Sequence, residues 1–257
     1  MNPEKSICIV IPCFNEEKRL PFEEFHSFIQ EYPKVLICFV NDGSADDTLK
    51  ILEELKLKNQ EQVDVVSYPT NVGKAEAVRR GIHHCNSHYD HVHIAYLDAD
   101  LSTSLQECMR LREYLNETIE FCFGSRIRLL GTFIKRKKRR WFLGRIIATI
   151  ISQMLRINVY DTQCGCKLFT KALSIRLFQD QFISKWLFDV ELFFRMITLF
   201  GMELAIPKML EVPLTTWIDN DVSLVKVSYV FKLWLDLYHI NKTYKARAFR
   251  KPSLETV

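Results

Sequence analysis

The sequence has no run of eighteen consecutive apolar residues, which is about the length that a membrane-spanning helix needs. Its opening, MNPEKSICIVIP, contains too short an apolar stretch for a secretory signal peptide. It also lacks a repeat with a period of 20 to 50 residues and a linker rich in Gly and Ser. We therefore expect one globular domain that does not span a membrane.

Neither the charge nor the cysteine content points to a specialised class of protein. Lys and Arg total 35 against 31 for Asp and Glu, and this small excess does not favour nucleic acid as a partner. The eight cysteines show no disulfide framework, and several lie in apolar runs, where a thiol behaves as a small hydrophobe. This cysteine usage is typical of a reducing cytosol.

In the first half of the chain, β-rich apolar runs alternate with helical patterns. Such alternation is typical of a mostly parallel sheet with crossover helices, an α/β fold. One expected helix follows the second strand within 43–59, where Ser44 could cap the first turn and leucines form an apolar stripe. The expected strands are 6–12, 35–42, 63–68, 91–98 and 119–125.

Polar segments follow four of these elements. In an open α/β sheet, ligands gather beyond the carboxyl ends of the strands. Any one such segment is ordinary turn chemistry, because Asn, Asp and Gly are common at strand ends. Four of them at the same edge indicate a binding site: PCFNEE (12–17), NDGSADDT (41–48), NVGKAEA (71–77) and DADLS (98–102).

Two aspartates in the last of these segments are separated by one alanine. In an extended backbone, residues i and i+2 point to the same side, so Asp98 and Asp100 can face one site. Mg²⁺ is usually held by one or two carboxylates together with substrate phosphates. The pair therefore predicts a metal site at Asp98 and Asp100 that is shared with a phosphate-bearing ligand.

These four segments resemble the motifs of inverting family-two glycosyltransferases of the GT-A fold. PCFNE is similar to the nucleotide-binding P-x-[YF]-N-E, and NDGSADDT to the D-D-G-S-x-D-x-T loop. NVGKAEA is similar to N-x-G-K-x-x-A, and DADLS to the metal-binding D-A-D. The order and spacing also agree with that family over residues 6–102.

The second half resembles one branch of the family, the dolichyl-phosphate and polyprenyl-phosphate glycosyltransferases. The segments that carry this likeness are FGSR (123–126), DTQCGCKLF (161–169) and WLFDVEL (186–192). Within the branch they are most similar to the dolichyl-phosphate beta-glucosyltransferases. WIDNDVS (217–223) is similar to the W-x5-S-K loop of the glucosyl branch, with Leu224 in place of its Lys.

The resemblance implies a Rossmann-like GT-A fold, a central mostly parallel sheet flanked by helices. Residues 1–244 would form one domain, with the nucleotide-sugar and metal half at 1–102 and the acceptor half at 103–244. Residues 245–257 would form a C-terminal tail.

The implied reaction moves a hexose from a nucleotide-sugar donor to a polyprenyl or dolichyl phosphate, with inversion. UDP-glucose is the favoured donor and GDP-mannose a second one, while a sugar hydroxyl in polysaccharide or glycolipid synthesis is the alternative acceptor. Asp98 and Asp100 would hold Mg²⁺ or Mn²⁺ on the diphosphate, and Lys74 would lie near the nucleotide. The base and ribose pocket would be lined by Pro12, Phe14, Glu16 and Asp42.

Besides Leu224, the chain departs from the family motifs at four further positions. Asn41 stands where the first Asp of D-D-G-S is usual, and Ala75 replaces a common Gly. Ser102 replaces a Gln that coordinates metal in some mannosyltransferases, which leaves the third metal ligand open. Cys166 replaces a Phe, which affects packing rather than chemistry.

A lipid-phosphate acceptor requires fixed cations. The phosphate is already an anion, so its oxygen can attack without a strong general base. Arg suits phosphate better than Lys because its planar fork makes two hydrogen bonds. By resemblance Arg126 is the first candidate and Arg140 the second, while Asp161 would orient the acceptor or act as a weak base. The ordinary alternative for Arg126 is a structural ion pair.

Residues 133–157 combine a cationic block with an apolar helical pattern that contains Trp141, Phe142 and Arg145. This combination suits an amphipathic helix in the membrane interface, although an ordinary core helix with a basic start is the alternative. We therefore expect a peripheral protein at the cytoplasmic face of a membrane. Relatives often carry transmembrane helices that this chain lacks, so a separate membrane-protein partner is possible.

Overall fold

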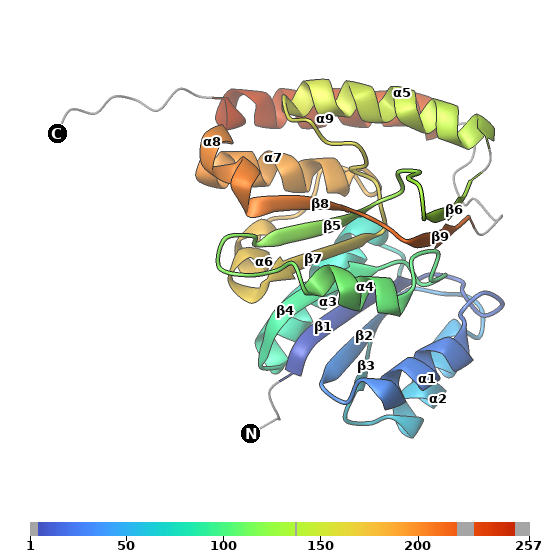
Figure 1. The fold of residues 1–257 in the computed structure, drawn as a ribbon. Helices are drawn as coiled ribbons and strands as arrows, with labels where there is room; N and C mark the ends of the chain where they lie inside the picture. The colour runs from blue at the N-terminus through green and yellow to red at the C-terminus, as the bar shows by residue number, and fades with distance from the viewer. Residues whose placement is uncertain (1–4, 137, 220–228, 250–257) are drawn as a thin grey trace.

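The computed structural model describes residues 5–136, 138–219 and 229–249 and is built around a seven-stranded sheet. The strand order is β3-β2-β1-β4-β7-β5-β8 (Figure 1). All neighbouring strands are parallel except that β7 runs antiparallel to both β4 and β5. The strands are β1 (Lys5–Cys13), β2 (Val35–Asp42), β3 (Val63–Tyr68), β4 (His91–Leu97), β5 (Phe121–Ser125), β7 (Cys166–Thr170) and β8 (Met209–Pro213).

The mostly parallel sheet and all five expected strands are confirmed. The central strands are apolar on both faces, and every residue of β2 is buried. Burial of both faces is what a parallel sheet covered by helices requires. The run VLICFVND therefore identifies an interior strand without any alternation of polar and apolar residues.

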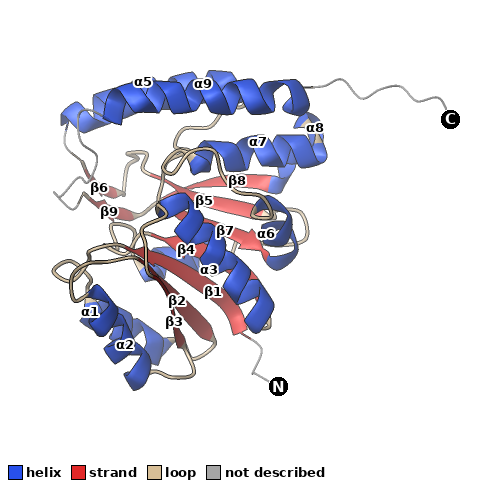
Figure 2. Ribbon diagram, turned by 180° about the vertical axis from the view of Figure 1, so that it is seen from behind, coloured by secondary structure: helices blue, strands red, loops and turns tan. Residues whose placement is uncertain are grey.

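Helices cover both faces of the sheet (Figure 2). Helices α1 (Phe22–Glu31), α2 (Thr48–Lys58) and α4 (Leu105–Arg112) bury their apolar sides against one face. The other face packs against α3 (Lys74–His88), α6 (Lys171–Leu177) and α7 (Phe188–Phe200), beyond which lie α5 (Lys138–Leu155) and α9 (Tyr229–Ala248). Short helical turns α8 (Met202–Ala205) and η1 (Ile206–Lys208) lead into β8.

Two expected boundaries are wrong. The helix expected over 133–157 starts only at Lys138, because β6 (Phe133–Lys135) pairs in parallel with β9 (Thr216–Ile218), a partner about eighty residues away in sequence. The expected tail at 245–257 begins too early, since α9 continues to Ala248. Ala248 is buried, and the Phe249 ring packs edge-on against Phe194.

The expected cap at Ser44 is also wrong. Helix α2 begins at Thr48, and the Ser44 hydroxyl instead accepts a hydrogen bond from the backbone N–H of Asn15 (3.0 Å). The Thr48 hydroxyl likewise accepts from the backbone N–H of Glu16 (2.7 Å). The loops after β1 and β2 are therefore bonded to each other, which fixes their side chains at one edge of the sheet.

Within the described ranges, no helix combines the length and the apolar character needed to cross a membrane.

Candidate functional site

The site lies where the carboxyl ends of β1, β2 and β4 meet the first turn of α3. A cavity of about 430 Å³ opens there. It is lined by the seven residues that the sequence assigned to nucleotide and metal: Pro12, Phe14, Glu16, Asp42, Lys74, Asp98 and Asp100. The fold therefore brings residues from four separate segments into one place.

Asp98 and Asp100 concentrate negative charge at the end of β4. Asp98 Oδ1 accepts a hydrogen bond from Lys74 Nζ (2.5 Å), and Asp100 Oδ1 accepts one from the backbone N–H of Ser102 (2.9 Å). Burial and the charge of Asp98 raise the pKa of Asp100. Burial alone would lower the pKa of Lys74, but Asp98, Asp189 and Asp100 together outweigh it and the pKa is raised.

This pair fits a divalent metal ion shared with a ligand. Its oxygen donors are the kind that Mg²⁺ and Mn²⁺ take, and a cation would offset both the burial and the charge of Asp98 that raise the pKa of Asp100. Over residues 5–136, 138–219 and 229–249, no group of three or more His, Cys, Asp or Glu side chains forms a metal-binding cluster. The remaining coordination positions would therefore be left for water and for phosphate oxygens.

Gly165 is required by the position of Asp98. A Cβ atom built on Gly165 would lie 1.9 Å from Asp98 Oδ2, far inside contact distance. The glycine immediately precedes β7, whose antiparallel course places its start beside the end of β4. The glycine of the DTQCG segment is thus needed for close approach to the carboxylate.

Glu16 lines the cavity, and one of its two carboxylate oxygens has no hydrogen-bond partner among the described residues. Its Oε1 forms an ion pair with Arg19 Nη2 (2.8 Å), while its Oε2 is buried with no hydrogen-bond partner among the described residues. Burial raises the pKa of Glu16 to about 7; Arg19 opposes this shift, and Asp100 and Asp98 add to it. A ligand hydroxyl group that donates to Oε2 would satisfy this atom.

Asp42 acts on the cavity through the backbone of the next loop. Its Oδ1 accepts from the N–H of Val72 (2.8 Å) and its Oδ2 from the N–H of Gly73 (2.9 Å). This pair of bonds fixes the turn that begins α3 and places Lys74 beside Asp98. Asp42 therefore lines the cavity, and it also holds the loop that positions Lys74.

A second cavity, of about 130 Å³, is lined by Arg126, Asp161 and further residues of α5 and its neighbours. Arg126 forms a two-pronged ion pair with Asp161, Nε to Oδ2 at 2.6 Å and Nη2 to Oδ1 at 2.8 Å. Burial would raise the pKa of Asp161, but Arg126 holds it well below its usual range. Such a carboxylate is a poor base, and the geometry favours its orienting role.

A charge in the first cavity acts on an arginine of the second. Burial would lower the pKa of Arg126, yet Asp161 raises it, and Asp98 in the first cavity adds to this rise. The ring of Trp217, the first residue of the WIDNDVS segment, lies with its centroid 5.3 Å from Arg126 Cζ. Residues 220–224 of that loop lie outside the described residues.

Arg136 and Arg145 also line the second cavity, and the sequence did not single them out as acceptor residues. Arg145 Nη1 donates to the carbonyl of Tyr160 (2.6 Å). Burial and the charge of Arg126 lower the pKa of Arg136, which forms no ion pair with another described residue. Gly144 makes room for this guanidinium, since a Cβ there would lie 2.8 Å from Arg136 Nη2. The excess positive charge suits an anion.

Arg140, the second expected acceptor arginine, falls in the first turn of α5, and its side chain lies outside the described part of the chain. Arg136 belongs to the cationic block KRKKRR (135–140), for which the sequence pattern predicts contact with a membrane surface. A basic run does not show which of its members turns inward.

A third charged pair lies behind the site. Lys167 is fully buried, and its Nζ lies 2.5 Å from Asp189 Oδ1 and donates to the carbonyl of Cys164 (2.6 Å). The Tyr96 hydroxyl also donates to Asp189. This carboxylate, at the start of α7, is therefore neutralised and hydrogen-bonded within the protein.

A family model, described as "Glycosyl transferase family 2", matches residues 8–178. A dolichyl-phosphate beta-glucosyltransferase of Trichomonas vaginalis is 32% identical over 251 residues, covering 92% of this chain and 71% of the relative. The human dolichyl-phosphate beta-glucosyltransferase is 29% identical over 260 residues, covering 91% of this chain and 78% of that one.

Solved structures share the fold. Glucosyl-3-phosphoglycerate synthase of Mycobacterium tuberculosis, in complex with Mn²⁺, UDP and phosphoglyceric acid, superposes with a TM-score of 0.65. The two chains are 17% identical, and the match covers 97% of this chain and 80% of the synthase. The GT-A architecture expected from the motifs is thereby supported by an independent comparison of structures.

We expect Gly165→Ala to destabilise the protein and displace Asp98. The added methyl group must push against a carboxylate, and overpacking of this kind costs about 1–3 kcal/mol. Urea denaturation of the wild type and the variant measures the loss. In an Asp98→Ala background the same change should cost much less, because the colliding carboxylate is gone. Equal losses in both backgrounds would show that the close approach to Asp98 does not matter.

Proposed function

Because this chain belongs to glycosyltransferase family 2, we propose that it transfers glucose from UDP-glucose to dolichyl phosphate or a related polyprenyl phosphate, inverting the anomeric centre. The observation behind this proposal is that consecutive residues line two cavities, Trp186 the carboxylate-lined one and Leu187 the arginine-lined one. The first suits a metal-bound diphosphate and the second suits a phosphate acceptor.

The donor assignment draws on the first cavity and on the relatives. Glu16 lines this cavity and has one oxygen, Oε2, that a ribose hydroxyl would satisfy, and Asp98 with Asp100 fits a divalent ion on the diphosphate. The two curated relatives are named as glucosyltransferases, and the synthase was solved with UDP and Mn²⁺. These findings favour UDP-glucose over GDP-mannose.

The acceptor assignment draws on the second cavity. A sugar hydroxyl would need a positioned base to take its proton. Asp161 is tied to Arg126, and Asp189 is tied to Lys167 and Tyr96, so neither carboxylate suits that task. Arg136, which no described carboxylate pairs, instead adds a positive charge beside the Arg126–Asp161 pair, and this net charge suits a phosphate. Lipid phosphate is therefore favoured over the hydroxyl alternative.

The proposed mechanism needs positioning more than proton transfer. The arginines hold the acceptor phosphate so that one of its oxygens faces the anomeric carbon. A bond forms from that oxygen to the carbon as the bond to the diphosphate breaks on the opposite side, and the nucleoside diphosphate leaves with the electron pair. Lys74 and Asp98 keep their geometry through the ion pair that joins them. A divalent metal, when bound, neutralises the departing charge.

Membrane attachment, with the chain at the cytoplasmic face, is part of the proposal. Helices α5 and α9, strand β6 and the loop before it expose large apolar side chains, a composition suited to a lipid interface. A separate membrane-protein partner is compatible with this arrangement and also stays a proposal. The exposed side chains are Leu129, Leu130, Phe133, Trp141, Phe142, Ile146, Trp234, Leu235 and Tyr238.

The purified protein should convert UDP-glucose and dolichyl phosphate to glucosyl lipid and UDP in the presence of Mn²⁺ or Mg²⁺. Excess EDTA should abolish turnover, and Asp100→Asn should lower it on the order of a hundredfold or more, because the metal-binding charge is halved. Product analysis of radiolabelled lipid measures both effects. Faster consumption of GDP-mannose, or transfer only to sugar hydroxyls, would contradict the proposal.

Loss of Arg126 or Arg136 should impair use of the acceptor and spare the donor. Arg126→Ala should lower kcat/KM for lipid phosphate by about a hundredfold, with Arg126→Lys recovering only part. Arg136→Met, which keeps the apolar stem, should lower it about tenfold or more. Calorimetry should find donor affinity within a few-fold of wild type.

Arg176→Ala, which removes an exposed arginine of α6, serves as the matched control and should leave turnover unchanged. If donor affinity falls with Arg126→Ala while the dependence on acceptor is unchanged, Arg126 belongs to the donor diphosphate.

Membrane binding should depend on the exposed apolar side chains near the second cavity. The double change Leu130→Glu with Phe142→Glu should reduce binding to anionic liposomes more than tenfold, since burying each side chain is worth about 1.5–3 kcal/mol. Leu57→Glu, at another exposed apolar position, on α2, is the control and should have no effect. Equal sedimentation of all three proteins with liposomes would remove the membrane surface from the proposal.

A further inference from the structure

The segment between α6 and α7 supplies two side chains to the donor cavity: Lys185, which no quoted motif includes, and Trp186, the first residue of WLFDVEL. The carbonyl of Lys185 accepts a hydrogen bond from the N–H of Ala75 in the first turn of α3 (3.1 Å). The aliphatic part of Lys185 lies over Gly73, where a Cβ would be 2.8 Å from Lys185 Cδ. Lys185 is therefore packed against the loop that leads to Lys74.

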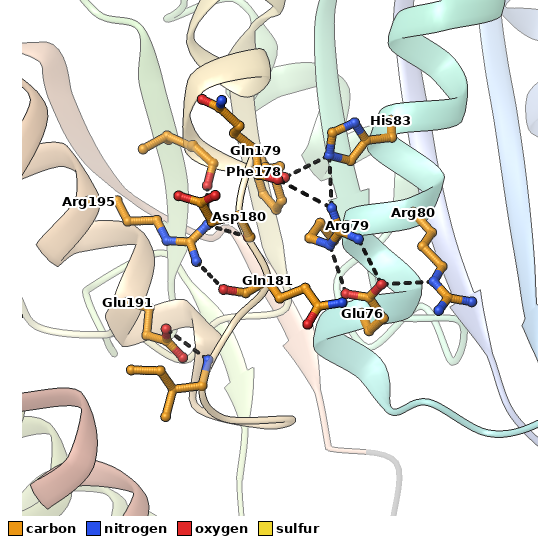
Figure 3. A network of polar contacts seen from close by, with 12 residues as sticks. Glu76, Arg79, Arg80, His83, Phe178, Gln179, Asp180, Gln181, Glu191 and Arg195 are labelled. Carbon is orange, nitrogen blue, oxygen red and sulfur yellow. Dashed lines mark hydrogen bonds and ion pairs between the residues drawn. The ribbon is translucent and has the colours of Figure 1, made fainter. Parts of the chain in front are cut away.

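Polar contacts from two helices hold this segment in place (Figure 3). Arg195 of α7 is buried, and its guanidinium lies 4.0 Å from the centre of the Phe182 ring. From α3, His83 Nε2 lies 2.8 Å from the carbonyl oxygen of Phe178. The guanidinium of Arg195 donates to the carbonyls of Leu177 (2.6 Å), Asp180 (2.9 Å) and Gln181 (2.7 Å).

The part of the segment next to Lys185 is held by one carboxylate and one hydroxyl. Glu191 accepts hydrogen bonds from the N–H groups of Ile183 (3.1 Å) and Ser184 (2.9 Å). Ser184 Oγ donates to Asp236 of α9 (2.6 Å) and accepts from the N–H of Leu187 (3.0 Å). The backbone on either side of Lys185 is thus fixed, which lowers the entropy cost of using its side chain.

Lys185 differs from the other two cations that line the cavity in its ion pairing. Arg19 is paired with Glu16, and Lys74 is paired with Asp98. Lys185 forms no ion pair with any residue in the described ranges. It is therefore the cavity cation whose charge is left for a ligand.

We propose that Lys185 binds the diphosphate of the donor and stabilises the nucleoside diphosphate as it leaves. This inference rests on the proposed function. When the bond from the sugar to the diphosphate breaks, the leaving group keeps the electron pair and gains one negative charge. A cation fixed beside it gains interaction energy at that moment, so its contribution is larger in the transition state than in the bound substrate.

Calorimetric titration of UDP and of UDP-glucose in the presence of Mn²⁺ tests this role. Lys185→Met keeps the aliphatic chain over Gly73 and removes the charge. We expect it to weaken UDP binding about tenfold, which corresponds to about 1.4 kcal/mol. UDP-glucose binding should weaken less, because its diphosphate carries less charge. Lys185→Arg should restore most of the UDP affinity.

Lys50→Met, which removes an exposed lysine of α2 outside the cavity, is the matched control and should bind UDP as the wild type does. Wild-type affinity in Lys185→Met, or an equal loss for both ligands, would overturn the assignment of Lys185 while leaving the proposed function in place. A wild-type protein that binds neither ligand would overturn the proposed function, and this inference with it.

Discussion

The negative charge of Asp98 at the end of β4 is the constraint around which the rest of the site is arranged. Lys74 forms an ion pair with it, Asp100 repels it, and its field reaches Arg126 in the neighbouring cavity. Gly165 leaves the space that the carboxylate occupies. Three elements that are far apart in sequence thus have to meet at one side chain. They are the start of α3, the end of β4 and the start of β7.

Buried ion pairs give the site its rigidity at a cost in desolvation. Lys167 with Asp189, and Arg126 with Asp161, are both largely removed from water. Pairs of this kind often add little to the free energy of folding, yet losing one partner leaves an uncompensated charge and is strongly destabilising. Their effect here is on geometry. The Arg126 fork is held in one orientation, and Asp189 is kept from acting as a base.

The segment from 178 to 187 connects the donor cavity to α9. Glu191 and Arg195 reach it from one side of α7, and Tyr244 of α9 donates to Glu191 (3.2 Å). Helix α9 also carries exposed apolar side chains such as Trp234 and Tyr238. The same helix therefore contacts the support of Lys185 on its inner side and presents a surface suited to lipid on its outer side.

The sequence by itself determined the strands and the polar segments that follow them, because both are local patterns. Short β-rich apolar runs such as VLICFVND favour interior strands, and D-A-D at a strand end places two carboxylates on one side. The residues of the donor cavity could therefore be predicted. The expected roles of Arg126 and Asp161 rested on the family resemblance. The structure adds that these two side chains form an ion pair with each other.

Only the tertiary structure decided which distant residues complete the site. The pairing of β6 with β9, and the antiparallel entry of β7, join segments that no local pattern connects. Arg136 turns inward because Gly144 leaves it room, and Lys185 reaches the donor cavity because α3 and α7 fix its backbone. These positions depend on contacts between side chains that are far apart in sequence, and the free energy of those contacts is not encoded in any single segment.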